Sequence, residues 1–310
     1  MIHHRRVAAI HGYYTGSHTG NLTTQAREGI MNNTTSVASC DLINTYDVLE
    51  HVMGMNGLHP HRKDLIENLR QQMAEHIENI VVPRNGVIVD LGCGSGSGTA
   101  ALAKLVPGIR VIGVDINSAS LEAARSRYAS IANLDFYHGD FDSYLLEHTD
   151  LPLMGVICIS VSMFIQDVEG FYRKIYGALH SHGVLIDAPF IFTGKCEYPH
   201  EHFRNATYAM CGCNMKMFQI TQLKEMARDA GFRDVSHRES GFDLMNLSVL
   251  FSDYPASRLF SNFIRNVISP PASIRHANSW YLLKRTIRIF SFFFSNREKY
   301  GGGELIAIKH

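Results

Sequence analysis

The sequence predicts an α/β fold in which a mostly parallel sheet carries helices on both faces. Short apolar runs, of the kind found in strands buried on both faces, alternate with helical segments between about residues 86 and 240. This alternation is the pattern of βαβ units, whose crossover helices join parallel strands. A glycine-rich turn directly follows the first strand, where open α/β sheets form a ligand crevice. We therefore expect a Rossmann-like sheet of seven strands.

The first strand is expected at Val87–Leu91, and the helix after the glycines includes residues 100–105. Each later segment is assigned from its apolar period, and the glycine at 231 closes the last of the predicted core helices. The further strands are expected at 110–114, 134–138, 155–161, 183–188, 232–238 and 304–309, and the further helices at 118–128, 168–179 and 221–230.

Two regions lie outside this core, which we assign to residues 86–240 and 301–310. Residues 1–85 are predicted to form a helical lid or cap region, with its clearest helix at 61–80. Residues 241–300 are rich in aromatic side chains and too apolar for a disordered linker, so we expect an inserted helical subdomain. It could cover a substrate pocket, form a homodimer interface, or lie on a membrane surface as an amphipathic helix.

The composition limits the class of function. Lys+Arg and Asp+Glu both number 29, and this zero net charge argues against a nucleic-acid partner. There is no apolar run of the length needed for a membrane span, and the N-terminus has no apolar core of a signal peptide. Six cysteines without a regular framework indicate a reduced protein. We therefore expect a cytoplasmic localisation.

The glycine-rich turn runs Asp90-Leu91-Gly92-Cys93-Gly94-Ser95-Gly96 between a strand and a helix. Glycines allow the tight turn and the close approach of a ligand, and the first N–H groups of the helix face that ligand. These features indicate a nucleotide-like cofactor. A dinucleotide fingerprint would need a glycine at Ser97, so the spacing argues against a nicotinamide cofactor.

The pattern Asp-x-Gly-x-Gly-x-Gly resembles motif I of the class I S-adenosylmethionine-dependent methyltransferases of small-molecule type. The resemblance extends to Asp115 at the end of the second strand and to Asp140 and Phe141 after the third, and covers about residues 60–240 and 304–309. It implies S-adenosyl-L-methionine as the cofactor, with Asp115 on the ribose hydroxyls and Asp140 and the Phe141 backbone on the adenine. The other cofactor contacts that we expect are Tyr14, Asp90, Gly92, Cys93, Gly94, Gly96, Ile116 and Ser160.

The acceptor is inferred from what the sequence lacks. The segment 160–167 has neither an obvious general base nor an Asn-Pro-Pro-Tyr motif for amine methylation. We therefore expect a small-molecule acceptor methylated at oxygen or carbon, within secondary metabolism. Because such acceptors lose a proton, a base is needed, and His200 and His202 after the fifth strand are the candidates. They could equally be solvated loop residues.

Several alternatives remain. Cys196, His200, His202, Cys211 and Cys213 include ligand types of zinc or iron, but their spacing lacks paired Cys-x2-Cys, and we expect ordinary thiols and no metal. Tyr14 could belong to a lid over the cofactor or to an exposed turn. A rival function is a cofactor-binding protein of the same fold that catalyses a non-methylating reaction such as a cyclisation. A nicotinamide-dependent oxidoreductase and an RNA methyltransferase are further rivals.

Overall fold

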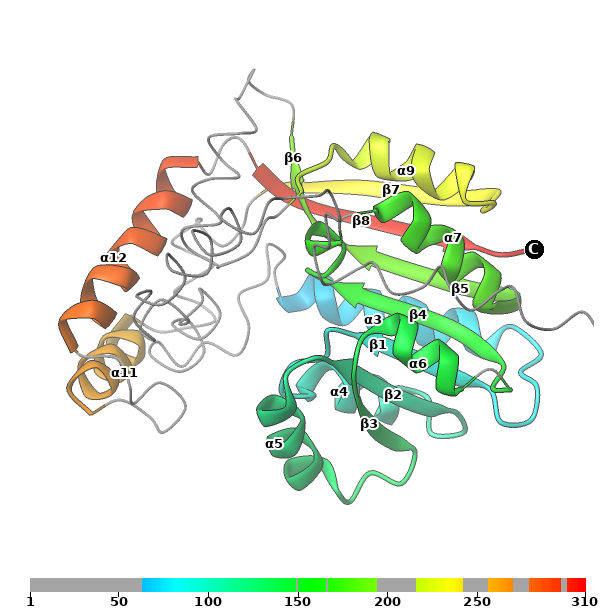
Figure 1. The fold of residues 1–310 in the computed structure, drawn as a ribbon, viewed down its shortest axis with the longest axis horizontal. Helices are drawn as coiled ribbons and strands as arrows, with labels where there is room; N and C mark the ends of the chain where they lie inside the picture. The colour runs from blue at the N-terminus through cyan, green and yellow to red at the C-terminus, as the bar shows by residue number, and fades with distance from the viewer. Residues whose placement is uncertain are drawn as a thin grey trace, which may run out of the picture.

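The computed structural model describes residues 63–148, 150–165, 167–193, 216–241, 256–269, 279–296 and 300–310. An eight-stranded sheet forms the core, in the order β3-β2-β1-β4-β5-β8-β6, with β7 also paired to β8 (Figure 1). Within this sheet β8 runs antiparallel to its neighbours, and the pairs among β1 to β5 are parallel. The strands are β1 (Val87–Leu91), β2 (Arg110–Asp115), β3 (Leu134–His138), β4 (Leu153–Ile159), β5 (Leu179–Ala188), β6 (Phe190–Phe192), β7 (Asp234–Gly241) and β8 (Tyr300–Ile308).

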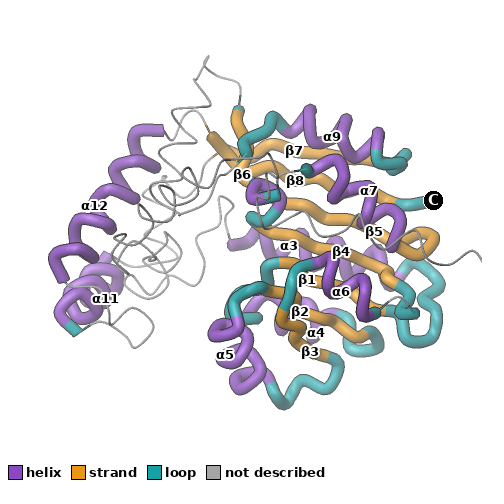
Figure 2. The backbone as a smooth tube through the Cα atoms, in the orientation of Figure 1, coloured by secondary structure: helices purple, strands orange, loops and turns teal. Residues whose placement is uncertain are grey.

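Helices cover both faces of the sheet, as the alternating pattern predicted (Figures 1 and 2). Those of the first face share one apolar cluster with the strands, and those of the second face share another. The first face carries α3 (Lys63–Glu78), α4 (Ser97–Leu105) and α5 (Ser118–Tyr128). The second face carries α6 (Phe141–Glu147), α7 (Val168–Ala178) and α9 (Ile220–Asp229).

The eighth strand, β6, is the one that the sequence pattern did not predict. Pro189 separates it from β5, and a proline has no N–H to continue a ladder, so the apolar run looked finished there. The proline carbonyl nevertheless accepts a hydrogen bond from Gly303 N–H at 2.9 Å. Since β5 pairs with the second half of β8 and β6 with its first half, β6 continues the line of β5.

Several strand boundaries differ from the prediction: β4 starts at Leu153, β7 spans Asp234–Gly241 and β8 starts at Tyr300. The differences at the end of β4 and at the start of β5 have local causes. Strand β4 ends at Ile159, two residues earlier than expected, because Ser160 takes a left-handed conformation with φ 59°. Strand β5 begins at Leu179, four residues before the expected start, where it exposes His180 and Ser181. A run of apolar residues predicts only the buried part of such a strand, and its exposed start is therefore missed.

Helix α3 lies in the part of the chain predicted to act as a lid. Its residues Leu69, Met73 and Ile77 are fully buried among side chains of the sheet and α4. This part of the 1–85 region therefore belongs to the core layer rather than to a movable cover.

The region between β7 and β8 contains the two helices α11 (Ala256–Ile268) and α12 (Ser279–Asn296). Gly241 at the end of β7 pairs in register with Gly301 at the start of β8. The two ends of this long excursion are thus neighbours in the sheet, which is how an insertion can be tolerated. None of the helices described is both long and apolar enough to span a bilayer.

Asn133 closes the far end of α4 and so holds the helix that follows the glycine turn. Its Nδ2 donates to the carbonyls of Ala103, Val106 and Ile109 at 2.9, 3.0 and 2.8 Å. The last carbonyls of a helix have no partner within the helix, and this amide group serves Ala103 in the last turn of α4, its C-cap Val106 and Ile109 in the turn that follows.

We expect Asn133→Ala to lower the free energy of unfolding by about 1–3 kcal/mol, because it removes the side-chain donor to three carbonyls, of which Val106 O keeps the hydrogen bond from Ile109 N–H. Asn79→Ala is the matched control, since Asn79 Nδ2 donates to Glu75 O at an exposed position. Its effect should stay within about 0.5 kcal/mol. Urea denaturation of both variants measures the difference, and equal losses would contradict the assigned role.

Candidate functional site

The candidate site lies at the carboxyl ends of the parallel strands. The order of the sheet reverses between β1 and β4, and in open α/β sheets this switch point forms the ligand crevice. The predicted cofactor residues that the structure describes lie at or directly after the ends of β1, β2, β3 and β4. The topology therefore brings to one edge of the sheet residues that are far apart in sequence.

The three glycines of the turn all adopt left-handed conformations, with φ 66° at Gly92, 53° at Gly94 and 76° at Gly96. A Cβ at Gly92 would clash with the Val161 side chain, and one at Gly96 would clash with Phe136. A Cβ at Gly94 would meet nothing within 4 Å. Two of the glycines thus permit tight packing, whereas Gly94 leaves its Cα facing open space that a ligand can enter.

Asp115, at the end of β2, faces this open glycine. Its Oδ2 accepts a hydrogen bond from Gly94 N–H at 2.8 Å, and its Oδ1 accepts one from Asn117 N–H at 2.8 Å. A carboxylate has about four acceptor positions, so each oxygen can still accept a further donor. Two hydroxyl groups on adjacent carbons suit such a pair of oxygens.

Asp90 is buried inside the turn rather than exposed to the crevice. Its Oδ2 accepts a hydrogen bond from Thr99 Oγ1 at 2.7 Å, which ties β1 to the first turn of α4. Burial raises the pKa of Asp90, and the nearby Asp115 carboxylate raises it further, while Arg70 and Thr99 oppose the shift. Burial raises the pKa of the Cys93 thiol, and the same two carboxylates raise it further, which disfavours the reactive thiolate.

Arg70 of α3 is a site residue that the sequence prediction missed. Its guanidinium lies against Gly98 at the start of α4, so closely that a Cβ at Gly98 would clash with Nη2. Burial lowers the pKa of Arg70, and the Asp90 and Glu67 carboxylates oppose that shift. A cation at the positive end of a helix favours an anion between the two. The feature of the sequence that could have indicated this role is Arg70 itself, the one arginine of α3, next to the buried Leu69.

Asp140 and Phe141, predicted to bind an adenine, lie after β3, and Ile116 of the predicted cofactor set lies after β2. Asp140 caps α6, with Oδ1 accepting from Ser143 N–H at 2.8 Å, and the Phe141 ring packs edge-on against Phe171 in the core. Ile116 is exposed next to Asp115, and its carbonyl lies 3.1 Å from His138 Nε2. An apolar side chain left exposed at this edge is suited to stack on a planar ligand.

Asp187 near the end of β5 anchors the segment that follows β4. Its carboxylate accepts from Tyr172 Oη at 2.6 Å and from Ser162 Oγ at 3.1 Å, and it is fully buried. Burial raises its pKa to about 6, against the hydrogen bonds of Tyr172 and Ser162. Since the carboxylate is enclosed, it positions the segment after Ser160 and does not act as a base. An aspartate within the apolar run of β5 is the sequence signal for it.

Several predicted site residues lie outside the described residues: Tyr14, His200 and His202, together with Cys196, Cys211 and Cys213 of the possible metal cluster. Ser160 is described and buried, and its backbone N–H donates to Ala188 O at 2.9 Å. The structure therefore brings the described members of the predicted cofactor set to one edge of the sheet, and the predicted bases His200 and His202 lie outside the described residues.

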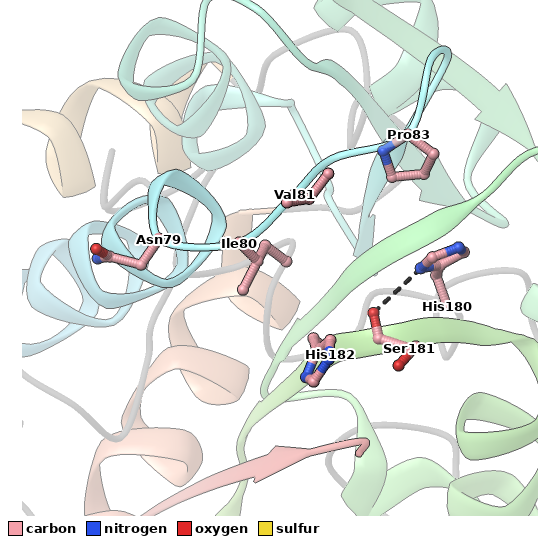
Figure 3. A pocket seen from close by; sticks show the side chains of 7 residues that line it. All are labelled: Asn79, Ile80, Val81, Pro83, His180, Ser181 and His182. Atoms are coloured by element: carbon pink, nitrogen blue, oxygen red, sulfur yellow. Dashed lines mark hydrogen bonds between the residues drawn. The ribbon is translucent and has the colours of Figure 1, made fainter.

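A cavity of about 560 Å³ lies at the opposite end of the strands. It is lined by the segment before β1 and by the start of β5, where His180 Nδ1 lies 3.1 Å from Ser181 O (Figure 3). Because the glycine turn follows the other end of β1, this cavity is not the cofactor crevice.

Comparison with known proteins agrees with this architecture. Residues 88–183 match the family described as a methyltransferase domain. Trans-aconitate 2-methyltransferase of Paracidovorax citrulli is 32% identical over 98 residues, which are 32% of this chain and 36% of that protein. Carboxy-S-adenosyl-L-methionine synthase of Campylobacter fetus is 32% identical over 117 residues, 37% of this chain and 46% of that protein. The chain thus matches less than half the length of these relatives.

The fold also matches solved structures. Phosphoethanolamine N-methyltransferase 2 of Haemonchus contortus, in complex with phosphomonomethylethanolamine and S-adenosylhomocysteine, has a TM-score of 0.60 at 16% identity. The match covers 84% of this chain and 56% of that one. Residues 88–183 are thus similar to a methyltransferase domain, and the described chain has the fold of this solved methyltransferase structure.

The buried Asp187 generates a prediction about pH. Its pKa in the folded protein lies above the ordinary value of 3.8, so the fold disfavours the ionised form. The contribution of Asp187 to stability is therefore largest below about pH 4 and is lost as the pH rises to about 6.

We expect the stability of the wild type, relative to Asp187→Asn, to fall by about 1–3 kcal/mol between about pH 4 and about pH 7, because the amide does not titrate. Urea denaturation across this range measures it. Asp229→Asn, at an exposed position on α9, serves as control and should show no comparable trend. A flat difference for Asp187→Asn would contradict the assignment.

Proposed function

We propose that this protein binds S-adenosylmethionine between the glycine turn and Asp115 and transfers its methyl group to oxygen or carbon of a small molecule. The observation that carries the proposal is the Asp115 carboxylate, held 2.8 Å from Gly94 N–H beside the open face of that glycine. The ribose hydroxyls would occupy the remaining acceptor positions of Asp115. Asp140 and the Phe141 backbone would bind the adenine, with Ile116 on its face.

The charges of the site support this cofactor over a dinucleotide. Burial raises the pKa of Asp90, and repulsion from the Asp115 carboxylate adds to this shift. A sulfonium cofactor with an ammonium group and one carboxylate has a net positive charge, which relieves this repulsion. The pyrophosphate of a dinucleotide would add to it. Arg70 would then pair with the methionine carboxylate at the start of α4.

The sulfonium supplies an activated methyl group when the cofactor is bound. The residues of this chain have to hold the acceptor in line with it and exclude water. Ser162 and Asp187 would keep the segment after β4 in place beside the acceptor. For a hydroxyl or carbon acceptor a base has to remove a proton, and His200 and His202 remain our candidates for it.

A second candidate function is a non-methylating reaction of the bound cofactor or of a substrate beside it. It is favoured by one of the matched relatives, which by its name makes a derivative of S-adenosylmethionine. The two functions differ in their product, since methyl transfer leaves S-adenosylhomocysteine. Release of S-adenosylhomocysteine during turnover with an acceptor would support the proposal. Conversion of the cofactor or of a substrate without release of S-adenosylhomocysteine would support the second candidate.

We expect Asp115→Ala to weaken the binding of S-adenosylmethionine at least tenfold, because hydrogen bonds to a charged acceptor are worth about 1.5–3 kcal/mol. Asp135→Ala is the control, because it removes only an exposed ion pair with Arg110. Calorimetric titration with S-adenosylmethionine, S-adenosylhomocysteine and NAD measures the three affinities. Binding of NAD alone, or unchanged affinity in a folded Asp115→Ala protein, would refute the proposed site.

Arg70→Gln should weaken the binding of S-adenosylhomocysteine by about tenfold or more, because it removes the charged partner of the methionine carboxylate. Methylthioadenosine has no such carboxylate, so its affinity should not change. Arg84→Gln, exposed before β1 at the other end of the sheet, is the matched control. Equal losses for both ligands would show that Arg70 acts on the fold of the site and not on the carboxylate.

A further inference from the structure

Helices α11 and α12 differ in charge from the rest of the chain. The whole sequence has equal numbers of acidic and basic residues, 29 of each. The segments Ala256–Ile268 and Ser279–Asn296 contain no Asp or Glu. Their cations are Arg258, Arg265, Lys284, Arg285 and Arg288. The two helices therefore form a locally basic unit in a protein of zero net charge.

Helix α11 exposes a row of apolar side chains. Phe260, Ile264 and Ile268 recur every four residues, which places them on one face of the helix. Their exposed fractions are 66%, 41% and 74%. Arg258 and Arg265 are also exposed, and their positions fall about a third of a turn round the helix from this row. Apolar side chains flanked by cations are typical of helices that lie in a membrane interface.

Helix α12 also exposes a combination of apolar and basic side chains. Leu282 and Thr286 are buried on its inner side, whereas Trp280 and Ile287 are 63% and 59% exposed. Lys284 Nζ lies 4.9 Å from the centre of the exposed Trp280 ring. Tryptophan and lysine side chains each combine an apolar body with a polar end, so both are suited to the lipid headgroup region of a bilayer.

The two helices are held together as one unit. They pack against each other, and Ser279 Oγ at the start of α12 donates to Val267 O of α11 at 2.6 Å. In Figure 1 they lie on the side of the sheet toward which β4 and β5 point. This is the side of the candidate cofactor site, because the glycine turn and Asp115 also follow the carboxyl ends of their strands.

We propose that the exposed face of α11 and α12 binds the surface of an anionic lipid bilayer. We define this face as Arg258, Phe260, Ile264, Arg265, Ile268, Trp280, Lys284 and Ile287. The cations attract acidic headgroups, and the apolar row and Trp280 enter the boundary of the acyl chains. A second copy of the chain fits less well, since two such faces would oppose cations with cations and offer no carboxylate from either helix.

The test is co-sedimentation of the full chain with vesicles of phosphatidylcholine alone and of phosphatidylcholine mixed with phosphatidylglycerol. We expect binding to the mixed vesicles, weakened by salt, and little binding to phosphatidylcholine alone. Arg258→Glu with Arg265→Glu should reduce the affinity at least tenfold, since each cation near an anionic surface is worth about fivefold. Phe260→Ser with Ile264→Ser should reduce it as well, at unchanged net charge.

Two control variants make the same chemical changes elsewhere. Lys104→Glu with Arg127→Glu reverses two exposed charges on α4 and α5, and Leu146→Ser removes an exposed apolar side chain from α6. Neither should alter vesicle binding, and the affinity for S-adenosylhomocysteine should be unchanged in all variants. No binding to mixed vesicles, equal binding to both kinds, or a dimer that the α11 substitutions dissociate would overturn the proposal.

Discussion

The hydrogen bond from Gly94 N–H to the Asp115 carboxylate is the interaction on which the candidate site depends. It joins the turn after β1 to the end of β2 through a side chain, beside the backbone hydrogen bonds from Gly92 and Cys93 N–H to Val114 O. A residue with a Cβ would be strained at the φ of Gly94 and would fill the space in front of it. The backbone of one strand end and the side chain of the next therefore define a single binding surface.

Behind this surface, buried carboxylates brace the segments that a ligand would touch. Asp90 holds α4 through Thr99, and Asp187 holds the segment after β4 through Ser162. Both carboxylates have raised pKa values because burial disfavours their charge. Each is stabilised by a hydroxyl donor, and the fold thereby fixes the two sides of the crevice from within.

The fold could be predicted because its determinants are local. The apolar run at Val87–Leu91 and the glycines after it set a strand and a turn, and Asp115 and Asp140 follow strands with the same alternation. Residues that act through tertiary contacts were missed. Arg70 gains its place only when α3 packs beside Gly98, and Asp187 only when Tyr172 of α7 reaches it. The spacing of apolar residues along the chain does not predict such contacts between distant helices and strands.

Strand ends show the same limit in a smaller way. The left-handed Ser160 ends β4 before its apolar run does, and Pro189 hides the continuation of β5 into β6. Both features depend on the backbone conformation and on the neighbouring strand. The residue types serine and proline do not predict them from sequence alone.

The position of β8 has a consequence for synthesis of the protein. It lies between β5 and β7 in the sheet, yet it follows both of them and the two helices α11 and α12 along the chain. During synthesis on the ribosome, the edges of β5 and β7 that pair with β8 stay unpaired until β8 has been made. Unpaired strand edges can pair with other chains. Closure of the sheet is thus a late event that joins distant parts of the chain, and we expect it to limit the rate of folding.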